Sequence, residues 1–198
     1  MVVLGLTSAG RARHILEDAF EATTYPGWLN FTLAGATDAE SNCKLYVSPR
    51  IESLAEVFPI VAKVFTRMEV RSFKVGRRLD GLLRPDKIVA YFDDRPHLDA
   101  VATELERELA GCPAQGVPFT TGIDADGLLS WGTDPPLGSE VLSWRSWVTK
   151  VLAAELLKVK AAARGDVVSD LLHGVARLGI DPARWTVDGG AFSTVRLS

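Results

Sequence analysis

The sequence predicts an α/β domain of the α+β kind, with a small, mainly antiparallel sheet flanked by helices and a helical C-terminal third. Three observations predict this fold class. A chain of 198 residues has the length of one domain, and 47% hydrophobic with 24% charged residues suffices for a core. Short β-patterned runs alternate with helical spacing before residue 113, whereas helical spacing dominates after residue 139. We expect a single domain over residues 1–187 and a flexible tail over residues 188–198.

Strands are predicted where β-branched and aromatic residues form short runs that stop near Gly or Pro. The predicted strands cover residues 28–33, 42–48, 71–75, 86–92 and, as a shorter run, 128–131. The run over residues 86–92 has the strongest β-pattern. Residues 76–81 are expected to form a turn between two of these strands.

Helices are predicted where apolar residues recur three and four positions apart. They cover residues 9–20, 52–68, 96–110, 140–163 and 166–178. Pro59 is expected to kink or break the second helix, because proline lacks the N–H that the helix ladder needs. The pair Asp93-Asp94 is expected to cap the third helix, which ends at Gly111. Residues 113–136 are dense in Pro, Gly and Thr and are expected to form a loop-rich wall.

Composition disfavours several classes of function. No apolar run approaches the roughly 20 residues that span a bilayer, and no basic leader precedes the apolar start, so we expect a cytoplasmic protein without membrane contact. Cys43 and Cys112 lack metal-ligand spacing and the three histidines lie far apart, which argues against a disulfide framework and against a metal site. A net charge of -3 and no evident ladder of stacking aromatics disfavour nucleic-acid binding.

One stretch of this acidic chain is nevertheless strongly basic. Its cations are Arg67, Arg71, Lys74, Arg77, Arg78, Arg84 and Lys87. Such a cluster favours an anionic ligand, since Lys and Arg give charge-assisted hydrogen bonds to phosphate and Arg can grip two oxygens. A solvated surface around a turn is the alternative interpretation. The pattern alone does not choose between them.

Strand alternation gives this cluster an orientation. Successive side chains of a strand point to opposite faces, so Lys74 points outward if Phe73 packs inward. The residues predicted to share the outward face are Lys44, Tyr46, Lys74, Lys87 and Tyr91. Neighbouring cations disfavour protonation of any one of them, so one lysine could have a lowered pKa and act as a base, with a tyrosine as proton donor.

Several motifs resemble a known family. Lys44-Leu45-Tyr46-Val47-Ser48 is similar to the Lys-x-His-Val/Ile-Ser strand of the bacterial phosphothreonine lyases and of the lyase domains of class III and IV lanthipeptide synthetases. Phe73-Lys74 is similar to their Phe-Lys strand. Residues 83–92, 116–120 and 143–147 resemble the Hop-A type III effector-like family, whose members occur in bacterial clusters for class V lanthipeptides and thioamitides beside a separate kinase-like protein. The resemblance spans about residues 43–147 and implies a phosphothreonine-lyase-like fold.

The resemblance also implies a role for each matched residue. Lys74 would be the general base that removes the α-proton of a phosphorylated Ser or Thr, and Lys44 would stabilise the resulting enolate. Arg84, with Lys87 as its neighbour, would hold the phosphate. Tyr91 would line the same site.

Two features depart from the pattern of the lyases. Tyr46 stands where those enzymes place their general-acid histidine, and its reference pKa of about 10 keeps it protonated at neutral pH. It would therefore serve as a weaker acid. The second phosphate-binding arginine has no assigned counterpart, and Arg50, Arg77 and Arg145 are candidates.

Together these matches predict a phosphoserine/phosphothreonine lyase that β-eliminates phosphate from a phosphorylated ribosomal precursor peptide. The products would be phosphate and dehydroalanine or dehydrobutyrine, formed without metal or organic cofactor in lanthipeptide or thioamitide biosynthesis. The chain carries no kinase motif, so a separate kinase-like protein would supply the phosphate, and a partner cyclase would use the product. The alternatives are a non-catalytic phosphopeptide- or leader-peptide-binding subunit that supports the kinase, and an effector-like adaptor. Trp144 and Trp147 fit either a core or a peptide groove.

Overall fold

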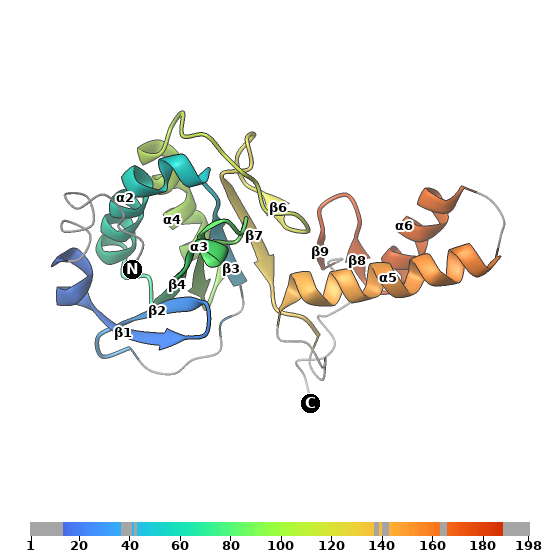
Figure 1. Ribbon diagram of the computed structural model, residues 1–198, viewed down its shortest axis with the longest axis horizontal. Helices are drawn as coiled ribbons and strands as arrows, with labels where there is room; N and C mark the ends of the chain where they lie inside the picture. The colour runs from blue at the N-terminus through green and yellow to red at the C-terminus, as the bar shows by residue number, and fades with distance from the viewer. Residues whose placement is uncertain are drawn as a thin grey trace. The chain divides into compact units, whose positions relative to one another are not determined.

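The computed structural model describes residues 14–36, 41, 43–136, 139, 143–162 and 166–187. Their backbone contacts divide them into two compact units (Figure 1). The first unit contains the described residues up to Val117 together with residues 122–131, and the second contains residues 118–121 and those described from Gly132 onward. The predicted tail over residues 188–198 lies outside the described residues.

A seven-stranded sheet lies mostly within the first unit. Its strands are β1 (Phe20–Tyr25), β2 (Trp28–Leu33), β3 (Cys43–Val47), β4 (Ser72–Gly76), β5 (Ile88–Phe92), β6 (Thr121–Gly122) and β7 (Leu129–Thr133). Thr121 of β6 and residues 132–133 of β7 belong to the second unit. They follow the order β1-β2-β4-β5-β3-β7-β6. The pairs β1/β2, β2/β4, β4/β5 and β3/β5 are antiparallel. The mainly antiparallel sheet is therefore confirmed.

Strand β1 is absent from the predicted elements. The first predicted helix is described from His14 and ends at Ala19, and Phe20 then opens β1 instead of closing the helix. Every residue of β1 after Phe20 is exposed. An edge strand of this kind has no apolar alternation to reveal it, because neither of its faces is buried along its length.

Helices α2 (Leu54–Arg67) and α4 (Arg95–Glu108) pack together on one side of the sheet (Figure 1). A 3-10 turn, η1 (Ile51–Ser53), precedes α2. Helix α2 continues through Pro59, so the predicted break at this proline is wrong. The side chains of Phe58 and Val61, on either side of Pro59, are buried and hold this turn of the helix against the core. The predicted cap of α4 is present, because Oδ1 of Asp94 accepts a hydrogen bond from the backbone N of His97 at 2.8 Å.

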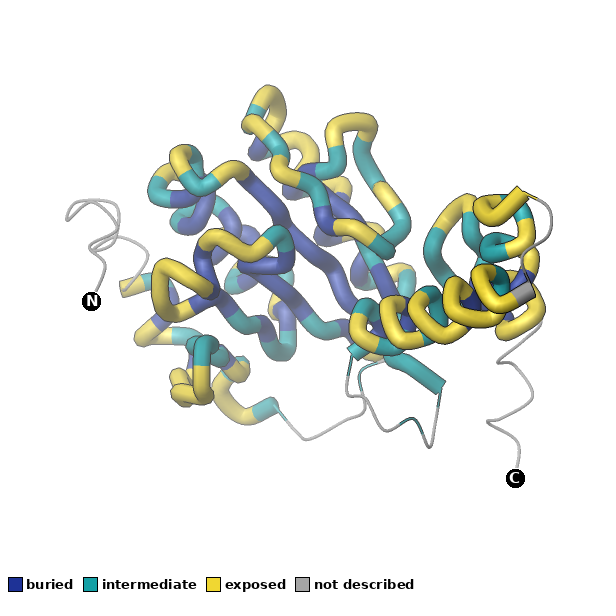
Figure 2. The backbone as a smooth tube through the Cα atoms, turned by 45° about the vertical axis from the view of Figure 1, so that its right-hand side comes forward, coloured by how far each residue is buried: buried dark blue, intermediate teal, exposed yellow. Residues whose placement is uncertain are grey.

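Phe73 of β4 lies at the centre of the core. Its ring centroid is 5.2 Å from that of Phe20, 4.7 Å from that of Phe31 and 5.0 Å from that of Phe65. Figure 2 shows that the central segments of the first unit are buried, whereas exposed residues lie mainly in the segments around them. Because Phe73 faces this core, alternation directs Lys74 to the opposite face of the sheet, as the sequence predicts.

Gly76, at the end of β4, lies directly against the short helix α3 (Leu79–Leu82). A Cβ added at Gly76 would lie 2.5 Å from the carbonyl carbon and oxygen of Gly81. These backbone atoms cannot rotate away. We expect Gly76→Ala to lower the free energy of unfolding by about 1–3 kcal/mol, measured by urea denaturation. Gly122→Ala is the control, because its Cβ would meet nothing closer than 3.6 Å; equal losses in both variants would contradict this close packing.

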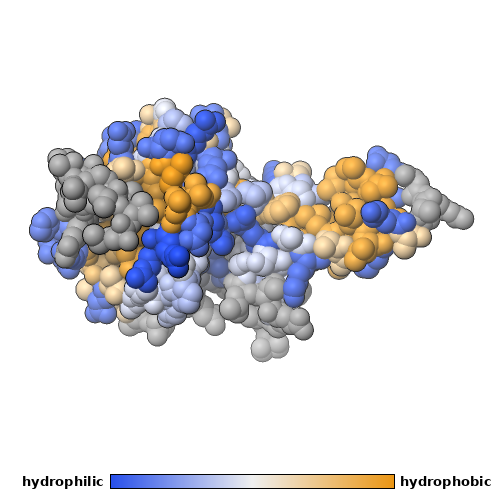
Figure 3. All heavy atoms as spheres, viewed as in Figure 1, coloured by the Kyte–Doolittle hydropathy of each residue, from blue (hydrophilic) through white to orange (hydrophobic). Residues whose placement is uncertain are grey.

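The second unit is mainly helical, which confirms the helical C-terminal third. It contains α5 (Trp144–Ala162), α6 (Val167–Arg177) and the hairpin of β8 (Ile180–Asp181) and β9 (Thr186–Val187). Trp144 is fully buried and its Nε1 donates to the carbonyl oxygen of Trp185 at 2.9 Å, whereas Trp147 is half-buried and lines an open groove. Apolar side chains are also exposed on both helices (Figure 3). Over the described residues, no helix combines the length and apolarity needed to cross a membrane.

Candidate active site

The face of the sheet opposite the phenylalanine core holds the site residues in rows across the strands. In one row Lys74 of β4 pairs with Asn30 of β2 on one side and with Val89 of β5 on the other. Val89 also pairs with Tyr46 of β3. Paired residues of neighbouring antiparallel strands share a face, so Lys74 and Tyr46 face the same way, two strands apart.

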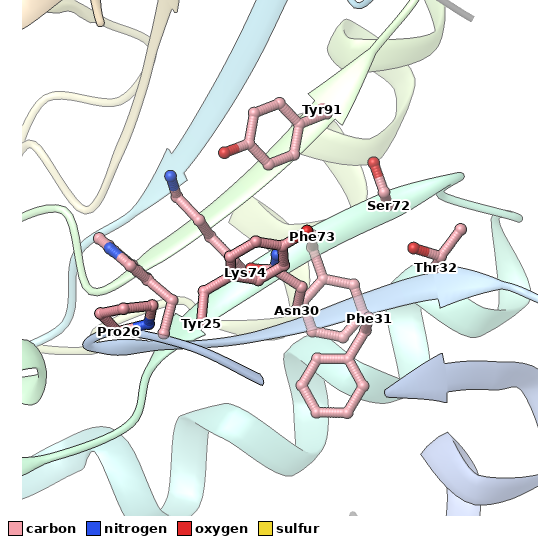
Figure 4. Close-up of a pocket in the computed structure, with 10 residues that line it drawn as sticks. Tyr25, Pro26, Asn30, Phe31, Thr32, Ser72, Phe73, Lys74 and Tyr91 are labelled. Atoms are coloured by element: carbon pink, nitrogen blue, oxygen red, sulfur yellow. The ribbon is translucent and has the colours of Figure 1, made fainter. Parts of the chain in front are cut away.

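The next row places two lysines around one phenol ring. Tyr91 of β5 pairs with Ser72 of β4 and with Lys44 of β3. The Nζ atoms of Lys44 and Lys74 each lie 5.5 Å from the centroid of the Tyr91 ring, and Figure 4 shows Lys74 and Tyr91 on the same side of the sheet. Lys44 is 8% exposed, so its cationic end is held within the structure rather than in bulk water.

Trp28, the first residue of β2, lies close to two cations, Lys74 and Arg84. Lys74 Nζ lies 4.4 Å from the centroid of its ring, and Cζ of Arg84 lies 5.3 Å from it. Both distances are within the range of a cation–π interaction. The residue opposite Trp28 on β4 is Gly76, which places no side chain beside the indole. The ring is thereby open to both cations.

Arg84 is fixed in place by Asp86. Its Nε and Nη2 donate to Oδ1 and Oδ2 of Asp86, each at 2.9 Å, in a bidentate pair. The Asp86 side chain is 12% exposed and that of Arg84 is 51% exposed, so the carboxylate is the buried anchor and the guanidinium is the exposed end. The hydrogen bonds to Asp86 raise the pKa of Arg84. A guanidinium held in this way is preorganised for an anion.

Lys87 is turned into the protein. Its Nζ donates to the carbonyl oxygen of Pro49 at 2.8 Å and to Oε1 of Gln115 at 2.5 Å, and the residue is fully buried. Ser48 Oγ donates to the carbonyl oxygen of Pro85 at 2.6 Å. These bonds tie the Arg84–Lys87 segment to the end of β3, so Lys87 holds the loop that carries Arg84 and does not present its ammonium at the surface.

Burial lowers the pKa of Lys87 from 10.5 to about 8, and this shift predicts a pH dependence. Between these two pH values the unfolded chain binds more protons than the folded chain, so stability rises as pH increases. We expect the free energy of unfolding of the wild type to rise relative to that of Lys87→Met from pH 8 to 10.5. Urea titrations at constant ionic strength measure this difference. Lys63→Met, at an exposed site on α2, should show no such slope; a flat difference for Lys87→Met would contradict the burial of its amine.

A shallow hollow of about 480 Å3 lies beside Lys74 (Figure 4). Its lining residues are Tyr25, Pro26, Trp28, Asn30, Phe31, Thr32, Ser72, Phe73, Lys74 and Tyr91. Next to it, Tyr46, Val89 and Val117 form a buried apolar cluster against which Trp28 and Tyr91 pack. The arrangement combines lysines and an arginine with aromatic and apolar walls, which strengthens charge interactions because it excludes water from part of the site.

The three candidates for a second phosphate-binding arginine have different environments. Arg50 donates from Nε to the carbonyl oxygen of Ala114 at 3.3 Å. Arg77 is exposed directly after β4, and Arg145 belongs to the second unit, where its Nε donates to the carbonyl oxygen of Pro118 at 3.1 Å. These contacts do not identify any of the three arginines as the second phosphate-binding residue.

Sequence reasoning missed Trp28, Asp86 and Gln115 as parts of the site. Asp86 had a local signal, because a carboxylate two residues after Arg84 can reach the same guanidinium. Trp28 and Gln115 had none, since their contacts with Arg84 and Lys87 join distant segments. Among the residues that the structure describes, no group of three or more His, Cys, Asp or Glu side chains could hold a metal ion.

Comparison with known proteins places this fold. Neither a protein family nor a curated protein matches the sequence. The effector protein from Pseudomonas syringae pv. tomato strain DC3000 has a similar structure, with a TM-score of 0.60 over 92% of this chain and 82% of its own, at 12% identity. The effector protein from Pseudomonas syringae pv. syringae strain 61 has a TM-score of 0.54 over 90% and 82%, at 15% identity.

The type III effector and phosphothreonine lyase OspF from Shigella flexneri is also similar. Its TM-score is 0.51 over 64% of this chain and 75% of its own, at 11% identity. The protein is an α+β protein with a seven-stranded, mainly antiparallel sheet. Its fold is phosphothreonine-lyase-like and is similar to that of the two Pseudomonas effector proteins.

Proposed function

We propose that this protein is a phosphoserine/phosphothreonine lyase. The observation that carries the proposal is the convergence of three cations on two aromatic rings of one sheet face. Lys74 lies against both Trp28 and Tyr91, with Lys44 beside Tyr91 and Arg84 beside Trp28. A phosphorylated residue needs such an array, because one cation must hold the phosphate while a second group takes the α-proton.

In the proposed reaction the neutral amine of Lys74 takes the α-proton of the phosphorylated residue. The electron pair of that C–H bond forms the Cα=Cβ double bond as the Cβ–O bond breaks, and phosphate leaves with the electrons of the broken bond. Tyr46 donates its phenolic proton to the leaving oxygen. Lys44 stabilises the negative charge that develops on the substrate carbonyl. The products are dehydroalanine or dehydrobutyrine and inorganic phosphate.

Arg84 holds the phosphate, and Tyr91 lines the site between the two lysines. The bidentate contact with Asp86 supports this role, because it leaves an exposed guanidinium in a fixed orientation. Lys87 contributes by fixing the loop through Pro49 and Gln115. The reaction needs neither a metal nor an organic cofactor, since the amine and the phenol supply both proton transfers.

The substrate in this proposal is a ribosomal precursor peptide that a separate kinase-like protein has phosphorylated. The hollow beside Lys74 is open on the sheet face, and such a site suits a segment of a peptide chain. The dehydrated peptide would pass to a cyclase in lanthipeptide or thioamitide biosynthesis. The family resemblance of the sequence motifs supports this assignment of pathway.

The presence of a buried tyrosine at position 46 favours one alternative function. In this alternative the protein is a non-catalytic phosphopeptide- or leader-peptide-binding subunit that supports the kinase. Tyr46 is 5% exposed and packs with Val89 and Val117. A phenol is a weaker acid than an imidazolium, so a tyrosine at this position suits binding better than protonation of a leaving group. The same cationic face would then hold the phosphate without chemistry.

Mass spectrometry of one phosphoserine and one phosphothreonine peptide, incubated with the full chain and a chelator, tests the proposal. We expect a loss equal to the mass of phosphoric acid together with an equimolar release of inorganic phosphate. Peptides that remain intact in these mixtures, also when the kinase and its precursor are supplied, would overturn the lyase assignment. Retained binding of those peptides would then support the binding subunit.

A further inference from the structure

We propose that Trp28 is a positioning residue that holds Lys74 and Arg84 together over one indole ring. This inference rests on the proposed lyase function, in which Lys74 takes the proton and Arg84 holds the phosphate. Lys74 Nζ and Arg84 Cζ lie 4.4 Å and 5.3 Å from the centroid of the ring. One side chain thereby contacts both the proposed base and the proposed phosphate-binding arginine.

Two cations need such a partner because they repel each other. Asp86 fixes Arg84 and Tyr91 also contacts Lys74, but neither residue contacts both cations as Trp28 does, so Trp28 opposes the repulsion that would move Lys74 away from Arg84. The negative face of an indole stabilises a cation by the quadrupole of the ring. Trp28 thus supports a geometry in which both cations are already near the place where a phosphorylated side chain binds.

The position of the ring is itself fixed. Trp28 packs against the apolar cluster of Tyr46, Val89 and Val117. The turn that precedes it is also held, because the carbonyl oxygen of Gly27 accepts a hydrogen bond from the backbone N of Arg77 at 3.0 Å. The ring therefore has a fixed orientation, and the two cations are positioned against it rather than the ring moving to follow them.

The chain offers a matched control. Trp131 of β7 has the same kind of contact, with Cζ of Arg95 lying 3.9 Å from the centroid of its ring, but it touches neither Lys74 nor Arg84 in any contact of that kind. Trp131→Leu therefore removes a tryptophan and a cation–π contact without affecting the proposed pair. Trp28→Phe keeps an aromatic face at the site, and Trp28→Leu removes the face while keeping apolar volume.

Steady-state elimination kinetics with a phosphopeptide test the inference. We expect Trp28→Leu to raise KM and lower kcat, with a fall in kcat/KM of roughly tenfold or more, and Trp28→Phe to restore most of it. Trp131→Leu should keep the wild-type KM. A merely structural role would reduce the fraction of folded enzyme, which lowers the apparent kcat at an unchanged KM, so an unchanged KM in Trp28→Leu would overturn the inference.

Titration with inorganic phosphate separates this inference from the proposed function. If the wild type eliminates phosphate while Trp28→Leu matches Trp131→Leu in kinetics and in phosphate affinity, the inference alone fails. If the wild type eliminates nothing but Trp28→Leu binds phosphate several-fold more weakly than Trp131→Leu, the lyase function fails and the role of Trp28 stands. If the wild type neither eliminates nor binds phosphate, both are overturned.

Discussion

Lys74→Ala is expected to abolish elimination while leaving phosphopeptide binding nearly unchanged. In the proposed reaction the amine of Lys74 acts when the α-proton moves, so its loss removes stabilisation of the transition state and not of the bound substrate. Loss of a general base lowers kcat by about 10²- to 10⁴-fold. Release of inorganic phosphate gives the rate, and a calorimetric titration with the same phosphopeptide gives the affinity.

Two further variants show whether the amine or the charge of Lys74 matters. Lys74→Arg keeps a cation on the Trp28 ring but cannot act as a base near neutral pH, so it should bind the peptide and fail to eliminate. Lys63→Ala removes an exposed lysine from α2 and should retain full activity. An active Lys74→Arg variant would show that Lys74 supplies charge alone, and the base would have to be sought elsewhere.

The orientation of the site could be read from the sequence because strand alternation has a strict period of two. Once Phe73 is assigned to the core, Lys74 must face the other way, and the same parity applies to Tyr46 and Tyr91. The register agrees, since Val89 pairs with both Lys74 and Tyr46.

Parity does not reveal where a long side chain ends. Lys87 has the parity of Val89, yet its ammonium reaches Pro49 and Gln115 and is buried there. A lysine carries four flexible methylenes, so its end is decided by acceptors brought from distant segments. In a single sequence nothing marks Gln115 as such an acceptor.

The order of the strands in the sheet could not be predicted from the sequence either. Trp28 reaches Lys74, which lies 46 positions further along the chain, only because β2 pairs with β4. Alternation within β2 indicates which residues share a face but not which strand lies beside them. The aromatic partner of the proposed base therefore became visible only with the fold.

Arg84→Ala is expected to weaken phosphopeptide binding itself, in contrast to Lys74→Ala. A charge-assisted hydrogen bond contributes about 1.5–3 kcal/mol, so the Kd should rise roughly 10- to 100-fold. The same calorimetric titration measures it, with Arg177→Ala on α6 as an exposed control of equal charge change. Elimination at saturating peptide should fall much less than in Lys74→Ala, because the base remains.

The loss of Arg84 has a second consequence that the experiment must separate. Asp86 would keep a nearly buried carboxylate without its bidentate partner, and this negative charge would repel a phosphate. The double variant Arg84→Ala with Asp86→Asn removes both charges. If Arg84 binds the phosphate directly, the double variant stays as weak as Arg84→Ala, since the guanidinium is still missing. Recovery of wild-type affinity in the double variant would instead mean that Arg84 only neutralises Asp86, and the phosphate would then depend on the two lysines beside Tyr91.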